Sequence, residues 1–289
     1  MTPRVREILE WYASESPGAV TNLARLLNSG FLAGTGKLCF LNGAVGFLDN
    51  PAGKFAANPN SYDPNYHYEV AISSEVSAYI GSLGFVQSAS QCFAGEIPTI
   101  LNLNTFENDK SVLLATTADA LRLGCVGVSL SIKPSVSISA DNLNQIQRTI
   151  ASAQQVGLPV LVNIVSEPKI DLLAEAVQAS VQMGAHIVSL TTPADEFTSK
   201  EKSKVYQQGS VRKAKLYDRV KHILDCSLGG KRLVVFTGAE PISVEGQSIE
   251  AKEIARGGGF GSMVGLVALQ QSKEASVQMF KQIMTNFKI

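Results

Sequence analysis

The stretch PVLVNIVSEPKIDLLAEAVQASVQMGAHIVSLTT, residues 159–192, contains a complete strand–helix–strand unit. Its two ends, residues 159–165 and 186–192, are short and almost continuously apolar, as expected of strands that are buried on both faces of a parallel sheet. Residues 171–183 between them have the apolar spacing of a helix, and Gly184 follows as a helix stop. A helix that ends in glycine and leads into another strand is typical of a βαβ unit.

The same pattern recurs along the chain. Helical patterns fill the gaps between apolar runs, for example at residues 140–156 and 211–224. The apolar runs that we expect to form strands are residues 38–42, 78–84, 98–104, 125–133, 159–165, 186–192, 232–239 and 262–269. Eight such strands in 289 residues agree with the usual size of a β/α barrel, about 250 residues. The sequence therefore predicts an α/β fold, a (β/α)8 TIM barrel.

Two stretches lie outside this repeat. Residues 1–35 are expected to form an N-terminal helical extension, and residues 43–66 a long loop, rich in Gly, Asn and Pro, after the first strand. No linker-like tract separates either stretch from the rest, so residues 1–289 are predicted to form a single domain. Loops that follow strands lie at the C-terminal face of such a barrel, which is the face that carries the chemistry.

Charge and composition exclude several classes of partner. Lys+Arg and Asp+Glu are both 25, so the chain has no excess of cations with which to bind nucleic acid or an anionic membrane. No apolar run reaches the roughly 20 residues that span a bilayer, and the N-terminus lacks a signal-peptide core. Cys39, Cys92, Cys125 and Cys226 form no C-x-x-C pair and are predicted to be buried free thiols in a reducing cytoplasm. The 3 histidines share no ligand spacing, so we expect neither a metal nor another cofactor.

Several motifs share one family resemblance. They read LLNSGFLAGTG (26–36), FAANPNSYDP (55–64), IPTILNLN (97–104), GLPVLV (157–162), GAHIVSL (184–190), FTGAE (236–240) and RGGGFGSMVG (256–265). In this order they resemble the archaeal and bacterial class I fructose-bisphosphate aldolases, in the deoxyribose-phosphate aldolase superfamily. The resemblance spans nearly the whole chain, and FAANP is its most specific part. It implies a TIM barrel, a small phosphorylated sugar as ligand, and a homo-oligomer.

The resemblance also implies which catalytic groups are replaced. A class I aldolase needs an amine that condenses with the substrate ketone, because the iminium then draws electrons from the adjacent carbon–carbon bond. The family places this lysine at the end of the sixth strand, where Ser189 stands here. Ala44 occupies the position of an acidic residue after the first strand, and Ile164 that of a tyrosine on the fifth. We therefore expect an aldolase homologue with little or no aldolase activity, acting as a sugar-phosphate-binding or assembly protein.

The phosphate site implied by the resemblance is only partly retained. Backbone N–H groups of Thr237 and Gly238, and of Gly258 and Gly259 in the glycine-rich turn, are candidates to bind phosphate. The arginine of the family motif on the eighth strand is replaced by Leu266. An ordinary structural glycine turn is the alternative.

Other polar residues at strand ends leave further hypotheses open. Asn102 and Asn163 can hydrogen-bond to a polyol or cap the strand ends. Lys133 ends the fourth strand and is expected to face the barrel mouth, so an active Schiff-base lyase with a relocated lysine is the alternative function. Glu167 and Lys169 can serve a different reaction on a phosphorylated or carbonyl substrate, or form a solvated loop.

Overall fold

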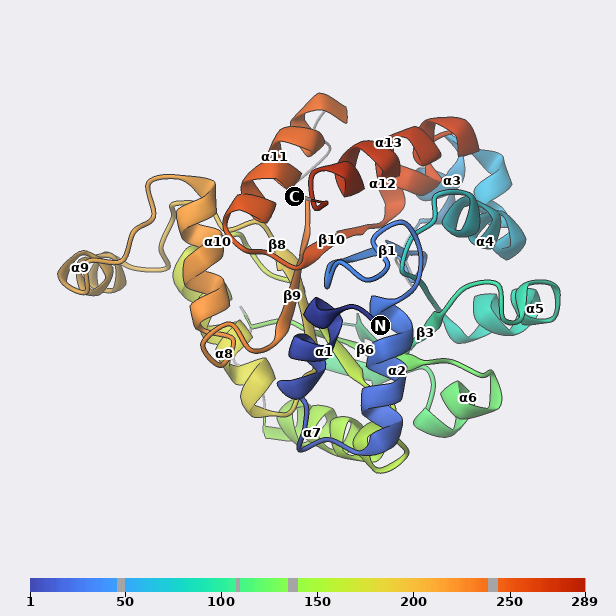
Figure 1. Cartoon of the computed structure of the whole chain (residues 1–289), viewed down its shortest axis with the longest axis horizontal. Helices are drawn as coiled ribbons and strands as arrows, with labels where there is room; N and C mark the ends of the chain where they lie inside the picture. The colour runs from blue at the N-terminus through green and yellow to red at the C-terminus, as the bar shows by residue number, and fades with distance from the viewer. Residues whose placement is uncertain (46–49, 108–109, 135–139, 239–243, 289) are drawn as a thin grey trace.

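Eight parallel strands close into a barrel in the computed structural model, which describes residues 1–45, 50–107, 110–134, 140–238 and 244–288 (Figure 1). The strands are β1 (Leu38–Asn42), β2 (Ala78–Gly81), β3 (Thr99–Asn102), β6 (Gly127–Ile132), β7 (Val160–Ile164), β8 (Ile187–Thr191), β9 (Leu233–Thr237) and β10 (Gly261–Val264). Around the barrel they follow the order β1-β10-β9-β8-β7-β6-β3-β2. The (β/α)8 TIM barrel predicted from the sequence is confirmed.

Helices form a layer around the barrel. Its main members are α4 (Pro64–Ser73), α5 (Leu83–Phe93), α6 (Thr117–Arg122), α7 (Ala140–Gln155), α8 (Ile170–Gln182), α10 (Leu216–Asp225), α11 (Val244–Arg256) and α13 (Lys273–Thr285). In α8, Leu173 and Val177 are fully buried, as their spacing predicts. Gly184 has φ +101°, a conformation that suits glycine after a helix end. The helix expected at residues 211–224 begins only at Leu216.

The register between strands sets which side chains share the inner wall. Asn163 pairs with Ser189 across β7 and β8, and Ser131 pairs with Asn163 across β6 and β7. Side chains alternate between the two faces of a strand. The neighbouring residues Val162 and Val188 therefore point outward to the helices, and both are fully buried. The inner wall near the C-terminal ends of these strands is polar.

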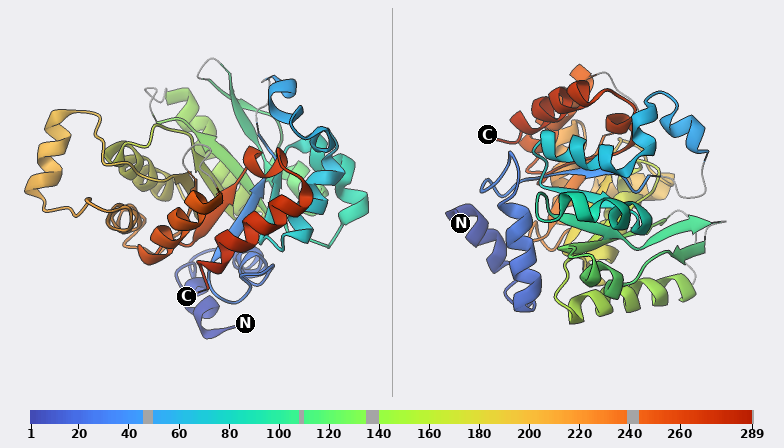
Figure 2. Two further views of the ribbon diagram at one scale, coloured as in Figure 1. Left: turned by 90° about the horizontal axis from the view of Figure 1, so that it is seen from above. Right: turned by 90° about the vertical axis from the view of Figure 1, so that its right-hand side faces the viewer.

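The N-terminal extension closes the opposite end of the barrel. It consists of α1 (Pro3–Glu10) and α2 (Pro17–Leu27), which lie at the end away from the hairpin β4–β5 (β4 Asn104–Glu107, β5 Lys110–Leu113) (Figure 2). The hydroxyl of Tyr12 donates to the carbonyl of His186 at 2.6 Å and accepts from the N–H of Leu233 at 3.1 Å. The extension is thus anchored to the first residues of two strand segments, and the predicted helical extension is confirmed.

Some segments differ from the expected repeat. The loop predicted at residues 43–66 contains a short helix, α3 (Pro51–Phe55), and a 3-10 turn, η1 (Pro59–Tyr62). The strand predicted at 262–269 ends at Val264, because the chain turns at Gly265 into the short helix α12 (Leu266–Leu269). The hairpin β4–β5 after β3 was not predicted.

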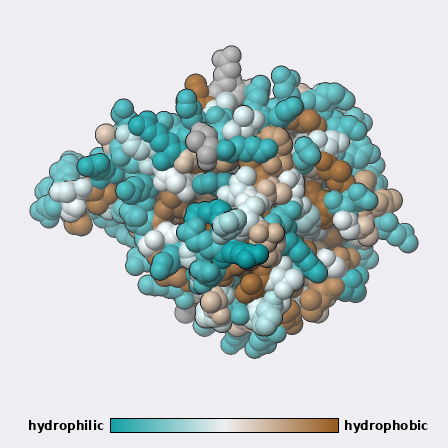
Figure 3. Space-filling model, in the orientation of Figure 1, coloured by the Kyte–Doolittle hydropathy of each residue, from teal (hydrophilic) through white to brown (hydrophobic). Residues whose placement is uncertain are grey.

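Helix α9 (Lys200–Gln208) lies on the surface and has no buried residue. It extends away from the barrel in Figure 1, and the same projection in Figure 3 is mostly hydrophilic. In the part of the chain that the structure describes, no helix has both the length and the apolar character needed to cross a membrane. The four cysteines are free, but Cys92 is exposed, so its predicted burial is wrong.

Candidate functional site

Two adjoining lobes form a cavity at the C-terminal end of the barrel. They share Asn42, Asn163 and Val165. We call the first the carboxylate lobe; it has a volume of about 380 Å³ and its polar lining includes Thr191, Thr237, Gly238, Gln247, Glu250 and Ser262. We call the second the lysine lobe; it has a volume of about 740 Å³ and its polar lining includes Lys54, Asn102, Asn104, Ser131 and Lys133. The two lobes together are large enough for a small sugar phosphate.

Ser189 lies on the inner wall below the cavity and is fully buried. Its hydroxyl donates a hydrogen bond of 2.8 Å to Oδ1 of Asn163, and its Oγ is 3.7 Å from the sulfur of Met263. The strand register of β7 and β8 brings the two side chains together. The position that the resemblance assigns to the lysine therefore holds a hydroxyl group, which has no nitrogen with which to form an imine.

The asparagines predicted as candidate ligands do reach the mouth. Nδ2 of Asn163 lies 3.5 Å from Oγ of Ser131, a long contact, while the hydroxyl of Ser129 donates to Oδ1 of Asn102 at 3.1 Å. Nδ2 of Asn102 donates to the carbonyl of Asn104 at 2.8 Å. Much of their hydrogen-bonding capacity thus holds neighbouring strands together, and Asn163 is the one that borders both lobes.

Lys133 follows β6 directly and lines the lysine lobe, as the sequence predicted. Its Nζ lies 5.2 Å from the centroid of the Phe106 ring on the hairpin. A contact of this kind over an aromatic ring is a cation–π interaction.

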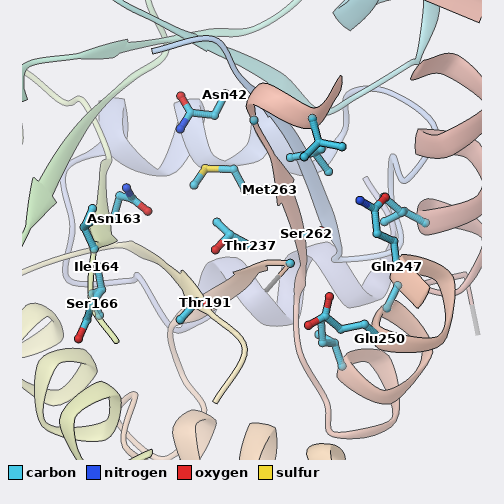
Figure 4. Close-up of a pocket in the computed structure, with 18 residues that line it drawn as sticks. Asn42, Asn163, Ile164, Ser166, Thr191, Thr237, Gln247, Glu250, Ser262 and Met263 are labelled. Atoms are coloured by element: carbon cyan, nitrogen blue, oxygen red, sulfur yellow. The ribbon is translucent and has the colours of Figure 1, made fainter. Parts of the chain in front are cut away.

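Two other positions that the resemblance singles out, Ala44 and Ile164, also border the cavity. Ala44 lines the lysine lobe, and its N–H donates to Oδ1 of Asn42 at 3.0 Å. Ile164 is buried, follows Asn163 on β7 and lines the carboxylate lobe (Figure 4). That Ile164 stands at the position of the family's tyrosine stays a prediction of the resemblance.

The carboxylate lobe contains a group that the sequence did not reveal. Glu250 on α11 is only 9% exposed, and the hydroxyl of Thr192 donates to its Oε1 at 2.5 Å. Gln247, one turn earlier, has a buried Oε1 without a hydrogen-bond partner among the described residues. Both side chains stand opposite Thr191 and Thr237 in Figure 4. An apolar spacing at residues 251 and 254, both buried, was the available signal for this helix.

The glycine-rich turn does not join the cavity. Gly258 and Gly259 precede β10, so they lie at the N-terminal end of the barrel, away from the mouth. The N–H of Gly258 donates to the carbonyl of Ala255 at 3.0 Å, and that of Gly259 to the carbonyl of Ile254 at 2.9 Å. Both donors close the end of α11, and the phosphate role predicted for them is corrected on this ground. Thr237 and Gly238 do line the carboxylate lobe.

The loop pair after β7 lies outside the lobes. Nζ of Lys169 is 2.5 Å from Oε2 of Glu167, whose side chain is 61% exposed. Neither residue lines the two lobes. The same loop region supplies Ser166 and Val165 to the carboxylate lobe. Within the described ranges, no group of three His, Cys, Asp or Glu residues has a geometry that could hold a metal ion.

Comparison with known proteins places this barrel in a family. The model of the DeoC/LacD family aldolases matches residues 50–271, which is most of the chain. The chain belongs to the DeoC/LacD aldolase family. A probable class 1 fructose-bisphosphate aldolase from Chlamydia muridarum is 25% identical over 290 residues, covering 91% of this chain and 82% of that protein. The resemblance stated from the motifs is confirmed.

Solved structures of fructose-bisphosphate aldolases share the fold. An archaeal fructose-1,6-bisphosphate aldolase, solved with its catalytic lysine covalently bound to a carbinolamine intermediate, has a TM-score of 0.72 and 18% identity, covering 92% of this chain and 98% of that one. A fructose-bisphosphate aldolase from Slackia heliotrinireducens has a TM-score of 0.78 and 16% identity, covering 95% of this chain and 88% of that one. At these identities the similarity establishes the fold alone.

Proposed function

We propose that this member of the aldolase family binds a small sugar phosphate at the barrel mouth and forms no Schiff base on β8, with little or no aldolase activity. The observation that carries the proposal is Ser189, a buried hydroxyl bonded to Asn163 where the resemblance implies a lysine. Loss of a single catalytic group lowers an enzyme's rate by orders of magnitude.

The lining of the mouth supports a polyhydroxylated ligand. Amide and hydroxyl groups from four strands, on Asn42, Asn102, Asn163 and Thr237, border the cavity. Such groups both donate and accept hydrogen bonds, as sugar hydroxyls require. The lysine lobe adds Lys54 and Lys133, whose ammonium groups supply the positive charge that one phosphate needs.

A second candidate function is an active lyase that uses Lys133. The favouring observation is the position of Lys133 at the mouth, next to the asparagines of the lysine lobe. Its Nζ already contacts the Phe106 ring, and this engagement stands against the function. The two candidates differ in one observable, a covalent adduct at Lys133.

Borohydride trapping with dihydroxyacetone phosphate tests the proposal. The protein is incubated with ligand and reductant, digested, and mapped by mass spectrometry, with an active class I aldolase as the positive control. We expect no reduced adduct on any lysine of the mouth. An adduct on Lys133 that is lost in Lys133→Met would reject the proposal in favour of the lyase.

One amine elsewhere needs attention in this experiment. Burial lowers the pKa of Lys37 to about 8, so part of it is neutral near that pH. Its Nζ donates to the carbonyl of Gly259 at 2.8 Å, at the end of the barrel opposite the mouth. A reduced adduct on Lys37 is therefore not counted as evidence of chemistry at the mouth.

An assembly role follows from the same resemblance. The family resemblance implies self-association, so we propose that the protein is a homo-oligomer in solution. Light scattering after size-exclusion chromatography tests this proposal directly. A mass equal to the 30.8 kDa of one chain at all concentrations would reject it.

A further inference from the structure

The carboxylate lobe has the wrong charge for a phosphate group. Among the described residues that line it, Glu250 is acidic and none is Lys or Arg. Phosphate sites in proteins usually offer positive charge or several free N–H groups. The lysines at the mouth line the other lobe. The two lobes therefore differ in the charge that each presents to a ligand.

The position of the Glu250 carboxylate shows which part of the carboxylate lobe would repel a phosphate. A Cβ atom built on Gly238 would lie 3.1 Å from Oε2 of Glu250, so the carboxylate rests against the backbone of Gly238. Gly238 follows β9, where the loops of β/α barrels commonly bind phosphate through backbone N–H groups. A phosphate placed on this backbone would meet a carboxylate that is only 9% exposed. Like charges repel strongly where water is largely excluded.

The lobe instead favours a ligand that donates hydrogen bonds. The Glu250 carboxylate is an acceptor, and Oε1 of Gln247 is a buried acceptor without a partner in the described part of the chain. A buried acceptor without a donor is costly. Sugar hydroxyl groups carry the proton that the Gln247 oxygen lacks, whereas a phosphate dianion carries none.

We infer that the carboxylate lobe takes the hydroxylated, unphosphorylated end of the ligand, so that the protein selects sugar monophosphates over sugar bisphosphates. The single phosphate lies toward the lysine lobe, with Lys54 and Lys133. This inference rests on the proposed function, because it assumes a sugar phosphate at the mouth. Repulsion from Glu250 supplies the selectivity, as an unfavourable contact with the wrong ligand often does.

Binding measurements with matched ligands test the inference. Fructose 1-phosphate, fructose 6-phosphate and fructose 1,6-bisphosphate are titrated by calorimetry into wild-type protein and Glu250→Gln. The amide keeps the shape and can still accept the Thr192 hydrogen bond. Wild type is expected to bind one monophosphate at least tenfold more tightly than the bisphosphate, and Glu250→Gln to reduce that ratio at least tenfold. Methyl-labelled Met263, which lines the carboxylate lobe, reports by NMR whether the ligand occupies it.

A matched control lies on the same helix. Glu253 lies outside the lobe, 3.8 Å from Arg256. Glu253→Gln removes the same charge and is expected to leave the affinity ratio of monophosphate to bisphosphate unchanged.

Should Glu250→Gln not fold, Gln247→Lys tests the same argument, because an added cation should also raise bisphosphate affinity at least tenfold. Tighter bisphosphate binding by wild type with a Met263 shift, or an unchanged ratio in the variant, would overturn the inference and leave the proposed function standing. If none of the three sugars binds, the proposed ligand is wrong and the inference falls with it.

Discussion

The hydroxyl of Ser189 on β8 donates a hydrogen bond of 2.8 Å to the amide oxygen of Asn163 on β7. Both side chains lie on the inner wall, and the strands are paired in register at these residues. The bond gives the buried hydroxyl of Ser189 a hydrogen-bond acceptor. Without it, this polar group would lie unpaired in the apolar layer beside Met263. The hydroxyl at this position therefore has a structural role, because it links β8 to β7.

Replacing Ser189 with alanine should therefore lower stability. The change leaves Oδ1 of Asn163 without this donor, and we expect a loss of about 1–2 kcal/mol in the free energy of unfolding. Urea denaturation measures it. Thr285→Ala is the control, because the exposed Thr285 hydroxyl donates only to a carbonyl of its own helix and should change stability by under about 0.5 kcal/mol. Equal midpoints for Ser189→Ala and wild type would show that the bond contributes nothing.

The end of the barrel opposite the mouth gives a second prediction, at Tyr12. Its fully buried hydroxyl bonds to the carbonyl of His186 and the N–H of Leu233. Tyr12→Phe keeps the ring but leaves both backbone groups without this partner, at an expected cost of about 2–3 kcal/mol. Tyr62→Phe is a matched control, because Tyr62 is 48% exposed and its hydroxyl makes only a long hydrogen bond, of 3.4 Å, to the carbonyl of Pro51 among the described residues. A loss in Tyr62→Phe as large as in Tyr12→Phe would contradict this explanation.

The sequence predicted the barrel well because its strands are defined locally. Continuous apolar runs and helices ended by residues such as Gly184 are patterns that neighbours along the chain determine. The site is different, because it depends on contacts between distant segments. Glu250 reaches Thr192 across 58 positions, and no spacing rule relates them. Gly258 and Gly259 form a motif that looks like an anion loop, but their place before β10 puts them at the other end of the barrel.

Stability is expected to fall with pH below about 6.5 because of two buried histidines. Burial lowers the pKa of His67 and of His186 from the ordinary value of 6.5. Below that pH the unfolded chain takes up protons that the folded protein resists, so the free energy of unfolding decreases as pH falls toward the folded pKa values. Nearby Glu15 opposes the shift at His186. Urea unfolding between pH 7.5 and 5.5 checks this, and a rise in stability on acidification would contradict it.

The variant that isolates one of these groups is His67→Gln. In the folded protein Nε2–H of His67 donates to the carbonyl of Ser61 at 2.8 Å, and Nδ1 accepts from the hydroxyl of Tyr79 at 3.2 Å. The neutral ring is therefore fully bonded, and protonation would bring a donor against the Tyr79 hydroxyl. The variant should be less stable at pH 7.5 but lose less stability on acidification than wild type. An unchanged pH slope would assign the effect to other groups.

Asn58, in the FAANP motif, is expected to stabilise its own loop rather than the whole barrel. Nδ2 of Asn58 lies 3.0 Å from the carbonyl of Leu269 and 2.6 Å from that of Gln271, so it ties the loop after β1 to the segment between α12 and α13. The side chain is buried, and its two amide hydrogens supply donors that water cannot easily replace. Asn58→Ala should cost about 1–3 kcal/mol and remove this link between the loop and the end of the chain.

Hydrogen exchange measured by mass spectrometry separates that local effect from general destabilisation. In Asn58→Ala, amides of residues 51–66 should exchange faster, while those of β7 and β8 keep their protection because they lie in the central barrel. Asn60→Ala is the matched control, since Asn60 is an exposed asparagine in the same turn. Faster exchange over the whole barrel in Asn58→Ala would mean that the residue supports the fold as a whole. Unchanged exchange at 51–66 would mean that other contacts, such as the hydroxyl of Ser61 on the same Leu269 carbonyl, suffice to hold the loop.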